Sequence, residues 1–179
     1  MPVSGAALAN TVTRTLLSLT SAATAGAPFK IPANYFNPAE GVSQAFRVEC
    51  GGFISNTATP AFTFAAALDT TQGTFGTALA ATGAFTTASG LASAEFNAWF
   101  DCVCTGVGTG GSLSVFGSFS IGPAGNAATA AAVTYMIGTS AGVAINTTVD
   151  NYLEIWGTWG AASPSNTATL QDYLVFGLN

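Results

Sequence analysis

The sequence contains no histidine. Histidine is the commonest general base near neutral pH, a frequent metal ligand, and the residue that activates the nucleophile in Ser-His-Asp and Cys-His sites. Its absence excludes those arrangements. A serine–lysine pair would have to use Lys30, the only lysine, and no S-x-x-K spacing leads to it. We therefore expect the chain not to be an enzyme.

Charge is scarce as well. Charged residues make up 6% of the 179-residue chain, against about 25% in an average soluble domain. An isolated soluble protein normally keeps interspersed charges on its surface. We therefore expect much of the folded surface to be covered by partner proteins or by identical copies of the chain.

Only three residues are basic, against eight acidic ones, which gives a net charge of −5. Arg14, Lys30 and Arg47 are isolated from one another in the sequence, whereas phosphate binding needs clusters of Lys and Arg. The same shortage disfavours docking on an anionic membrane. Nucleic acid and membranes are therefore not expected as partners.

Two stretches imitate targeting or membrane segments without having the full pattern. Residues 14–27 combine one positive charge with a short apolar run, but Ser and Thr break that run. Residues 124–145 are uncharged and long enough to span a bilayer, yet they contain Asn126 and no Leu, and they lack flanking Lys or Arg. Neither stretch is expected to be a signal or a membrane helix.

Cysteine occurs three times, at Cys50, Cys102 and Cys104. Cys102 and Cys104 lie two apart in a strand-like run, which places them on one face, and we expect them to be small core side chains. A disulfide from Cys50 to Cys102 or to Cys104 stays open as an alternative. Three cysteines without histidine make a poor zinc site, and no D-x-D-x-D-G calcium loop occurs. No metal and no cofactor are expected.

What the sequence does have is a strong period of two, the spacing of β-strands. Residues 112–121 place Leu, Val, Phe and Ile on one face and four serines on the other, with Phe116 as the exception. Residues 95–105 alternate in the same way. The link Gly106–Gly111 between them matches the letters of the dinucleotide motif G-x-G-x-x-G, but a strand and not a helix follows it. The two runs therefore predict a β-hairpin.

Further strands are predicted over residues 41–55, 60–68, 149–159 and 166–178, with weaker candidates at 11–19 and 133–137. In the last strong strand, the side chains expected to face the core are those of Leu170, Leu174, Phe176 and Leu178. Helix signals are nearly absent, since the Ala-rich stretches are interleaved with Gly and Thr. The pattern predicts an all-β fold: an antiparallel β-sandwich, jelly-roll-like, of about eight strands, with long Gly/Thr/Ala loops over 70–90 and 122–148.

The length suits a single domain. Residues 41–179 are expected to form the sandwich, and residues 1–40 an N-terminal arm with the first strand or strands, packing on the sandwich or on neighbours. The segment from Met1 to Asn10 is rich in Ala, Ser and Gly and has little with which to join a core. We expect it to bridge neighbouring subunits.

Aromatic residues are the remaining candidates for function. Trp99, Tyr152, Trp156 and Tyr173 fall on the side of their strands opposite the expected core stripe. Exposed aromatic residues are enriched at protein interfaces, and they can also line a carbohydrate groove. These four residues are the interface candidates, with sugar binding as the alternative. No catalytic, cofactor-binding or metal-binding residue is predicted.

Two parts of the chain resemble small jelly-roll virion proteins of tailed bacteriophages. Residues 148–178 are similar to their C-terminal hairpin: a strand ending in Trp159-Gly160, a short Ala/Ser loop reaching Asn166-Thr167, and a closing strand led by Thr169. Residues 46–64 are similar to an earlier strand, a short Thr/Pro turn and a second strand. The resemblance extends over residues 42–178 in scattered blocks.

This resemblance implies a structural virion protein without catalysis, either a head-decoration (cement) protein or a tail-associated one, often a homotrimer. A decoration protein would bind the outside of a viral capsid and stabilise it by inter-subunit contacts. Its partners would be the major capsid protein or other virion proteins, and its location the virion, assembled in the host cytoplasm. Two alternatives are a tail or receptor- or carbohydrate-binding β-module and a shell-forming jelly-roll coat protein.

Overall fold

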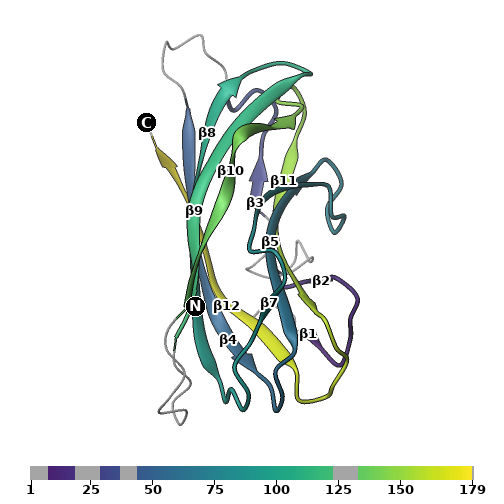
Figure 1. Cartoon of the computed structure of the whole chain (residues 1–179). Coiled ribbons are helices and arrows are strands. Elements are labelled where there is room, and N and C mark those ends of the chain that lie inside the picture. The colour runs from purple at the N-terminus through teal and green to yellow at the C-terminus, as the bar shows by residue number, and fades with distance from the viewer. Residues whose placement is uncertain (1–7, 19–28, 37–43, 123–132, 179) are drawn as a thin grey trace.

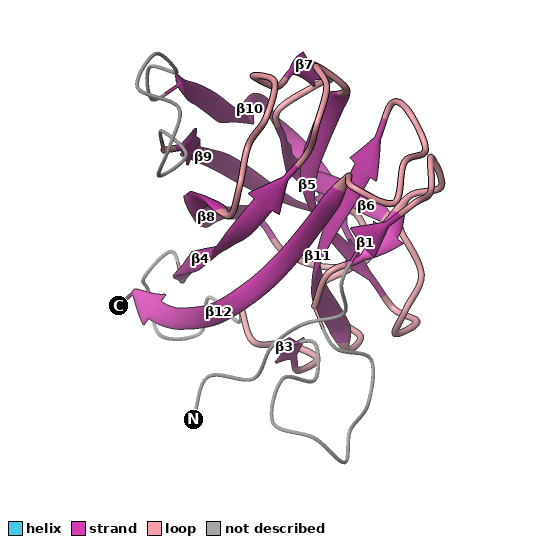
Figure 2. Ribbon diagram, turned by 90° about the horizontal axis from the view of Figure 1, so that it is seen from below, coloured by secondary structure: helices cyan, strands magenta, loops and turns pink. Residues whose placement is uncertain are grey.

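The computed structural model describes residues 8–18, 29–36, 44–122 and 133–178. Within these ranges the chain is all-β, and two antiparallel sheets pack face to face as a β-sandwich (Figure 1). Figure 2 looks along the sandwich and shows the two layers. None of the described residues lies in a helix that could cross a membrane. The predicted fold class is therefore confirmed.

Each sheet contains strands from distant parts of the sequence. Sheet A contains, in spatial order, β1 (Leu8–Ala9), β12 (Thr167–Leu178), β4 (Ala45–Ser55), β8 (Ala94–Gly106), β9 (Gly111–Ile121) and β10 (Val133–Ile145). Sheet B contains β2 (Thr15–Leu16), β11 (Asn151–Trp159), β5 (Ala61–Asp69) and β6 (Thr77–Ala81), with β3 (Phe29–Ile31) on β11 and β7 (Phe85–Thr86) on β5.

The connections combine a jelly-roll-like part with a meander. The chain passes from β4 in sheet A to β5 in sheet B, and it returns from β11 in sheet B to β12 in sheet A. On the way, β11 pairs with β5 and β12 pairs with β4. The last two strands therefore lie beside the first two long ones, as in a jelly roll. Between them, β8, β9 and β10 pair in sequence order within sheet A.

The core lies between the sheets and is rich in aromatic rings. Phe119 is at its centre, with its ring centroid 5.1 Å from that of Phe64, 5.6 Å from that of Phe96 and 5.7 Å from that of Phe85. Trp159 packs on Phe62 at 4.7 Å. Such clusters form because alternate residues of every long strand point toward the opposite sheet.

All three cysteines are buried and free. Their side chains face the core from β4 and β8, as the alternation predicted. The alternative of a disulfide from Cys50 is excluded, because all three thiols are free. Burial raises the pKa of the Cys50 and Cys102 thiols well above the ordinary value. Both therefore stay protonated near neutral pH and behave as small apolar groups.

The predicted strands and the hairpin are largely confirmed. The six strong candidates correspond to β4, β5, β8, β9, β11 and β12, and the glycine-rich link joins β8 to β9 as a hairpin. In residues 11–18, the described part of the weak candidate at 11–19, the strand is the two-residue β2. Residues 1–40 also provide β1 and β3, which pair with β12 and β11 of the same chain. The expectation that the arm Met1–Asn10 has little with which to join the core is wrong for Leu8, which is fully buried in the core. Residues 1–7 lie outside the described residues, so the bridging role stays a prediction.

Residues 133–145 form the thirteen-residue strand β10, so the weak strand candidate at 133–137 is confirmed and the long loop expected over 122–148 is wrong for residues 138–145. A break in the register between Thr139 and Val143, together with positive φ angles at Gly138 and Gly142, interrupts the alternation on which strand prediction rests. By contrast, residues 70–90 form a long connection with only the short strands β6 and β7.

A second irregularity reverses the faces of β12. The register with β4 shifts between Leu170 and Asp172, the signature of a β-bulge. Before the shift Leu170 is buried, and after it Leu174 is 51% exposed. The expectation that Leu174, Phe176 and Leu178 face the core is therefore wrong. An extra residue in a strand moves every later side chain to the opposite face.

The packing leads to a matched pair of predictions on β9. Phe119→Ala removes the ring at the centre of the core and should lower the free energy of unfolding by about 3–5 kcal/mol. Phe116→Ala, on the same strand but 52% exposed, should change it by no more than about 0.5 kcal/mol. Urea unfolding followed by tryptophan fluorescence measures both, and similar losses for the two variants would contradict the assignment of faces.

Candidate functional site

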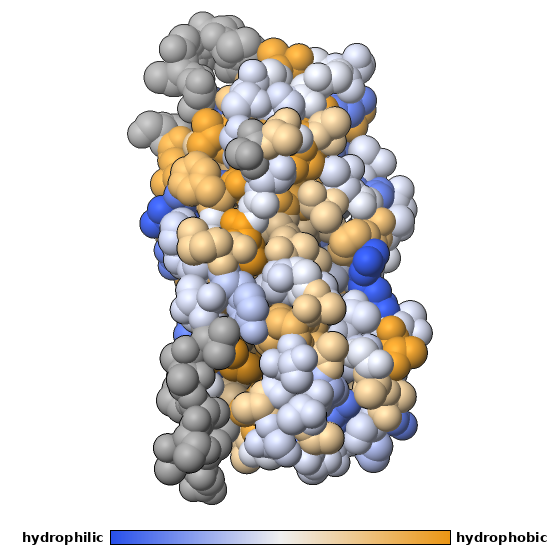
Figure 3. Space-filling model, in the orientation of Figure 1, coloured by the Kyte–Doolittle hydropathy of each residue, from blue (hydrophilic) through white to orange (hydrophobic). Residues whose placement is uncertain are grey.

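The outer face of sheet A exposes large apolar side chains from β4, β8, β9, β10 and β12. We call this surface the apolar face. Its exposed fractions run from 37% for Leu178 to 80% for Met136. The side chains that make it up are Phe53, Trp99, Phe116, Met136, Leu174, Phe176 and Leu178. Figure 3 views the molecule edge-on and shows hydrophobic residues reaching the surface, with strongly hydrophilic ones scattered.

The strand register makes these side chains neighbours. One row across sheet A runs Leu174, Glu49, Trp99, Ser118, Met136, and the next runs Phe176, Arg47, Asp101, Phe116, Gly138. Adjacent strands lie about 4.8 Å apart, so each row is a continuous line of contacts. Within these two rows the apolar side chains alternate with polar ones, and Phe53 lies further along β4, where it pairs with Glu95 and Thr169.

One ion pair lies within the patch. Arg47 Nε donates to Asp101 Oδ1 at 2.6 Å, and Arg47 Nη2 donates to Asp101 Oδ2 at 2.7 Å. The guanidinium carbon also lies 5.1 Å from the centre of the Trp99 ring, within cation–π range. This two-point pairing balances the Arg47 charge inside the sheet, so the surrounding surface keeps its apolar character.

Two hollows interrupt the apolar face. The first, of about 350 Å³, is lined by Arg47, Glu49, Asn97, Trp99 and Asp172, with small residues at its base. The second, of about 460 Å³, lies between Phe116 and Met136. Gly138 is opposite Phe116 and has a φ of +132°, where a side chain would be strained. A β-carbon at this position would also collide with the Val115 and Phe116 backbone, so glycine lets β10 approach β9 closely here.

The four aromatic candidates from the sequence are not brought together. Trp99 is 38% exposed on the apolar face, as predicted. Tyr152 is half-buried and lies on sheet B, where it pairs with Asp69 and Lys30. An interface role for these two residues stays a prediction.

Trp156 points away from the core but is covered, so the prediction that it is exposed is wrong. Only 7% of it is accessible. Phe75 packs edge-on against its ring at 5.6 Å, and the Arg14 guanidinium lies 3.6 Å from the centre of the Phe75 ring. The loop that carries Phe75 belongs to the 70–90 connection. The sequence pattern shows which side of β11 Trp156 occupies but not what lies over it.

Tyr173 faces the core, against the prediction, because the β12 bulge precedes it. Its hydroxyl donates to the Leu153 carbonyl oxygen of β11 at 3.0 Å, and so links the two sheets. Burial raises the pKa of this phenol well above its ordinary value. Tyr173 is a structural residue in this fold.

Sequence reasoning missed most of the apolar face. Phe116 could have been recognised, because it breaks an otherwise complete serine stripe. Leu174, Phe176 and Leu178 were expected in the core, and no residue pattern in the sequence around 170–172 predicts the bulge that turns them outward. Met136 lies in the weak strand candidate at 133–137, where the sequence analysis assigned no outward face to it.

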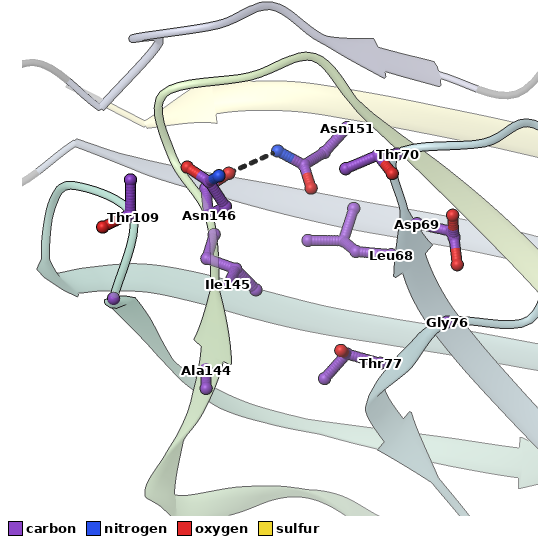
Figure 4. Close-up of a pocket in the computed structure, with 11 residues that line it drawn as sticks. Leu68, Asp69, Thr70, Gly76, Thr77, Thr109, Ala144, Ile145, Asn146 and Asn151 are labelled. Atoms are coloured by element: carbon purple, nitrogen blue, oxygen red, sulfur yellow. Dashed lines mark hydrogen bonds between the residues drawn. The ribbon is translucent and has the colours of Figure 1, made fainter.

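A third hollow, of about 310 Å³, opens at one end of the sandwich (Figure 4). Its amide side chains are engaged with nearby backbone: Asn151 Nδ2 donates to the carbonyl oxygens of Asn146 and Val149, each at 2.9 Å. Asn146 Oδ1 accepts from the Thr148 backbone N–H at 2.9 Å. Asp69 Oδ1 accepts from Thr71 N–H at 2.6 Å. These bonds shape the turns around the hollow.

Glu154 is a buried carboxyl group under the 70–76 loop, and 1% of the residue is exposed. One oxygen accepts from the Gly73 backbone N–H at 2.5 Å, and the other has no partner among the described residues. Burial raises the pKa of Glu154, the Gly73 bond acts in the opposite direction, and nearby Asp69 raises it further. Among the described residues, no group of three or more Cys, Asp or Glu side chains could hold a metal ion.

Comparison with known proteins assigns no family to the chain. No family model and no curated protein matches the chain. A solved structure, described as the CBM2 module of the evolved Dit of Lactobacillus casei BL23 phage J-1, aligns with 12% sequence identity over 82% of this chain and 66% of that one. The TM-score of 0.33 is too low for this likeness to support an argument about function.

The environment of Glu154 predicts a pH effect. The folded state binds its proton more tightly than the unfolded state, so the free energy of unfolding should fall as pH rises from the ordinary value of 4.5 to the raised one. Glu154→Gln should remove this contribution, whereas the exposed Glu95→Gln should leave it intact. Urea unfolding at about pH 4 and about pH 8 measures both, and an unchanged pH dependence in Glu154→Gln would contradict the assignment.

Proposed function

We propose that the chain is a non-catalytic structural protein of a virion, a decoration or cement protein that attaches to the outside of the shell through the apolar face. The observation that carries this proposal is the exposure of seven large apolar side chains on one side of one sheet. Monomeric soluble proteins rarely expose a contiguous apolar patch above a few hundred Å² unless it binds something.

The extent of the patch suits a stable interface. With a large side chain taken as about 200 Å², the exposed fractions of these residues correspond to roughly 700 Å². A standard protein–protein interface buries about 800 Å² on each partner. The apolar face therefore supplies most of one side of such an interface, with aromatic residues and Met, which interface cores favour.

The low charge of the chain supports the same proposal. Many of the exposed residues in the described part of the chain are Ala, Thr, Ser, Gly or Asn, and only eleven residues of the chain are charged. A protein held in a closed assembly needs less surface charge to stay dispersed than one that diffuses alone. The resemblance of residues 42–178 to phage virion proteins directs the proposal toward a viral shell.

A carbohydrate-binding tail module is the second candidate, and the hollow beside Trp99 favours it. An exposed indole ring next to Glu49, Asn97 and Asp172 combines an apolar stacking surface with hydrogen-bonding groups, which is what sugar recognition uses. Trp156 does not contribute, since it is covered.

The test uses shells from the virus that encodes the chain, prepared with this gene deleted. The wild-type chain should bind them, and Phe116→Ser combined with Leu174→Ser should weaken binding at least about 30-fold, because interface hot spots contribute about 2 kcal/mol or more. Val107→Ser is the control, since Val107 is 45% exposed but lies on the β8–β9 hairpin tip.

Cosedimentation with the shells, quantified over a range of concentrations, gives the dissociation constants. The proposal fails if the wild-type chain does not bind, or if the double variant binds as tightly as Val107→Ser. Binding to a glycan array that is lost in Trp99→Ala would instead establish the carbohydrate module.

A further inference from the structure

Acidic side chains lie among and beside the apolar residues of the apolar face. Glu95 and Asp172 are exposed and Glu49 is half-exposed, all on the outer side of sheet A. None of the three has an ion-pair partner in the described part of the chain, where the ion pairs are Lys30–Asp150 and Arg47–Asp101. The charge of Glu49 contributes to the raised pKa of Arg47, but the hydrogen bonds of Arg47 go to Asp101. The patch therefore carries excess negative charge.

The chain has no spare cation with which to match this charge. Lys30 Nζ lies 2.6 Å from Asp150 Oδ2, and Arg47 is paired with Asp101. Arg14, the last of the three basic residues, lies over the Phe75 ring on the sheet B side. In a two-fold pairing of apolar faces, each copy would bring Glu49, Glu95 and Asp172 to the contact, whereas Arg47, the basic side chain of this face, is already held by Asp101, so the paired faces would carry excess negative charge. Like charges brought together across an interface oppose binding.

The hollow beside Trp99 concentrates the unmatched acceptors. Asp172 Oδ1 and Asn97 Oδ1 both overhang Gly51, since a β-carbon on that glycine would lie 2.7 Å from the first and 2.9 Å from the second. The hollow is also lined by Glu49, by Trp99 and by Arg47, whose guanidinium is held by Asp101. Two carboxylates, an amide oxygen and an aromatic ring are the groups that bind an ammonium or guanidinium ion in proteins.

Resting on the function proposed above, we infer that the partner of the apolar face is a different protein and not a second copy of this chain. The partner presents an apolar surface with a Lys or Arg side chain that enters the hollow between Asp172, Glu49 and Trp99. Apolar contact supplies most of the affinity, and the cation determines which partner is accepted, because electrostatic complementarity acts mainly on specificity and association rate.

This inference is tested with the same gene-deleted shells. Glu49→Gln combined with Asp172→Asn should weaken binding roughly 30-fold or more and reduce its salt dependence, because the entering cation is left buried and unpaired. Glu95→Gln, a charge on the same face but outside the hollow, should change binding by less than about 3-fold.

Sedimentation equilibrium of the isolated chain is a second experiment, which needs no shells. The wild-type chain should show no association that depends on the apolar face, so Phe116→Ser should leave its molar mass unchanged. An association abolished by Phe116→Ser would show that a second copy occupies the face and would overturn the inference.

The outcomes separate the two proposals. Wild-type binding that is weakened by the Phe116 and Leu174 changes but unaffected by Glu49→Gln with Asp172→Asn overturns the charged-partner inference and leaves the proposed function standing. Failure of the wild-type chain to bind shells overturns both. Loss of binding in the charge variant, with Glu95→Gln near the wild-type value, is the expected result.

Discussion

The β-bulge between Leu170 and Asp172 determines which side chains of the last strand, β12, point to each side of sheet A. Because one extra residue reverses the faces of a strand, Tyr173 turns inward and hydrogen-bonds to β11 across the sandwich. The same reversal sends Leu174, Phe176 and Leu178 outward. The bulge therefore links the two sheets and, with the aromatic residues of β8 and β9, creates the apolar face.

Charge placement completes this surface. The strongest attraction on it, between Arg47 and Asp101, is satisfied within sheet A through two short hydrogen bonds, and the Arg47 side chain also lies against Trp99. What remains is excess negative charge from Glu49, Asp172 and Glu95, which lie among and beside the apolar residues. Such a surface favours a partner of opposite charge over a copy of itself, since desolvated like charges oppose contact. The proposed assembly role rests on this combination of shape and charge.

Much of the fold could be predicted from the sequence, because alternation along 95–105 and 112–121 reports directly which side chains face the opposite sheet. The hairpin at Gly106–Gly111 and the burial of the cysteines follow from the same pattern. The exposure of Leu174 and the burial of Trp156 could not be predicted. The first depends on a bulge with no local marker, and the second on a loop more than seventy residues earlier that brings Phe75 over the ring. Of the four predicted aromatic candidates, only Trp99 lies on the apolar face.

The central claim is that this side of sheet A is hidden by a neighbouring protein. Electron cryo-microscopy of the native particle tests it most directly, because the map shows which surface of each subunit is in contact. The account predicts that Phe116, Met136 and Leu174 lie against a subunit of different sequence, with a basic side chain beside Trp99. A map in which these residues face solvent while another surface makes the contacts would contradict it.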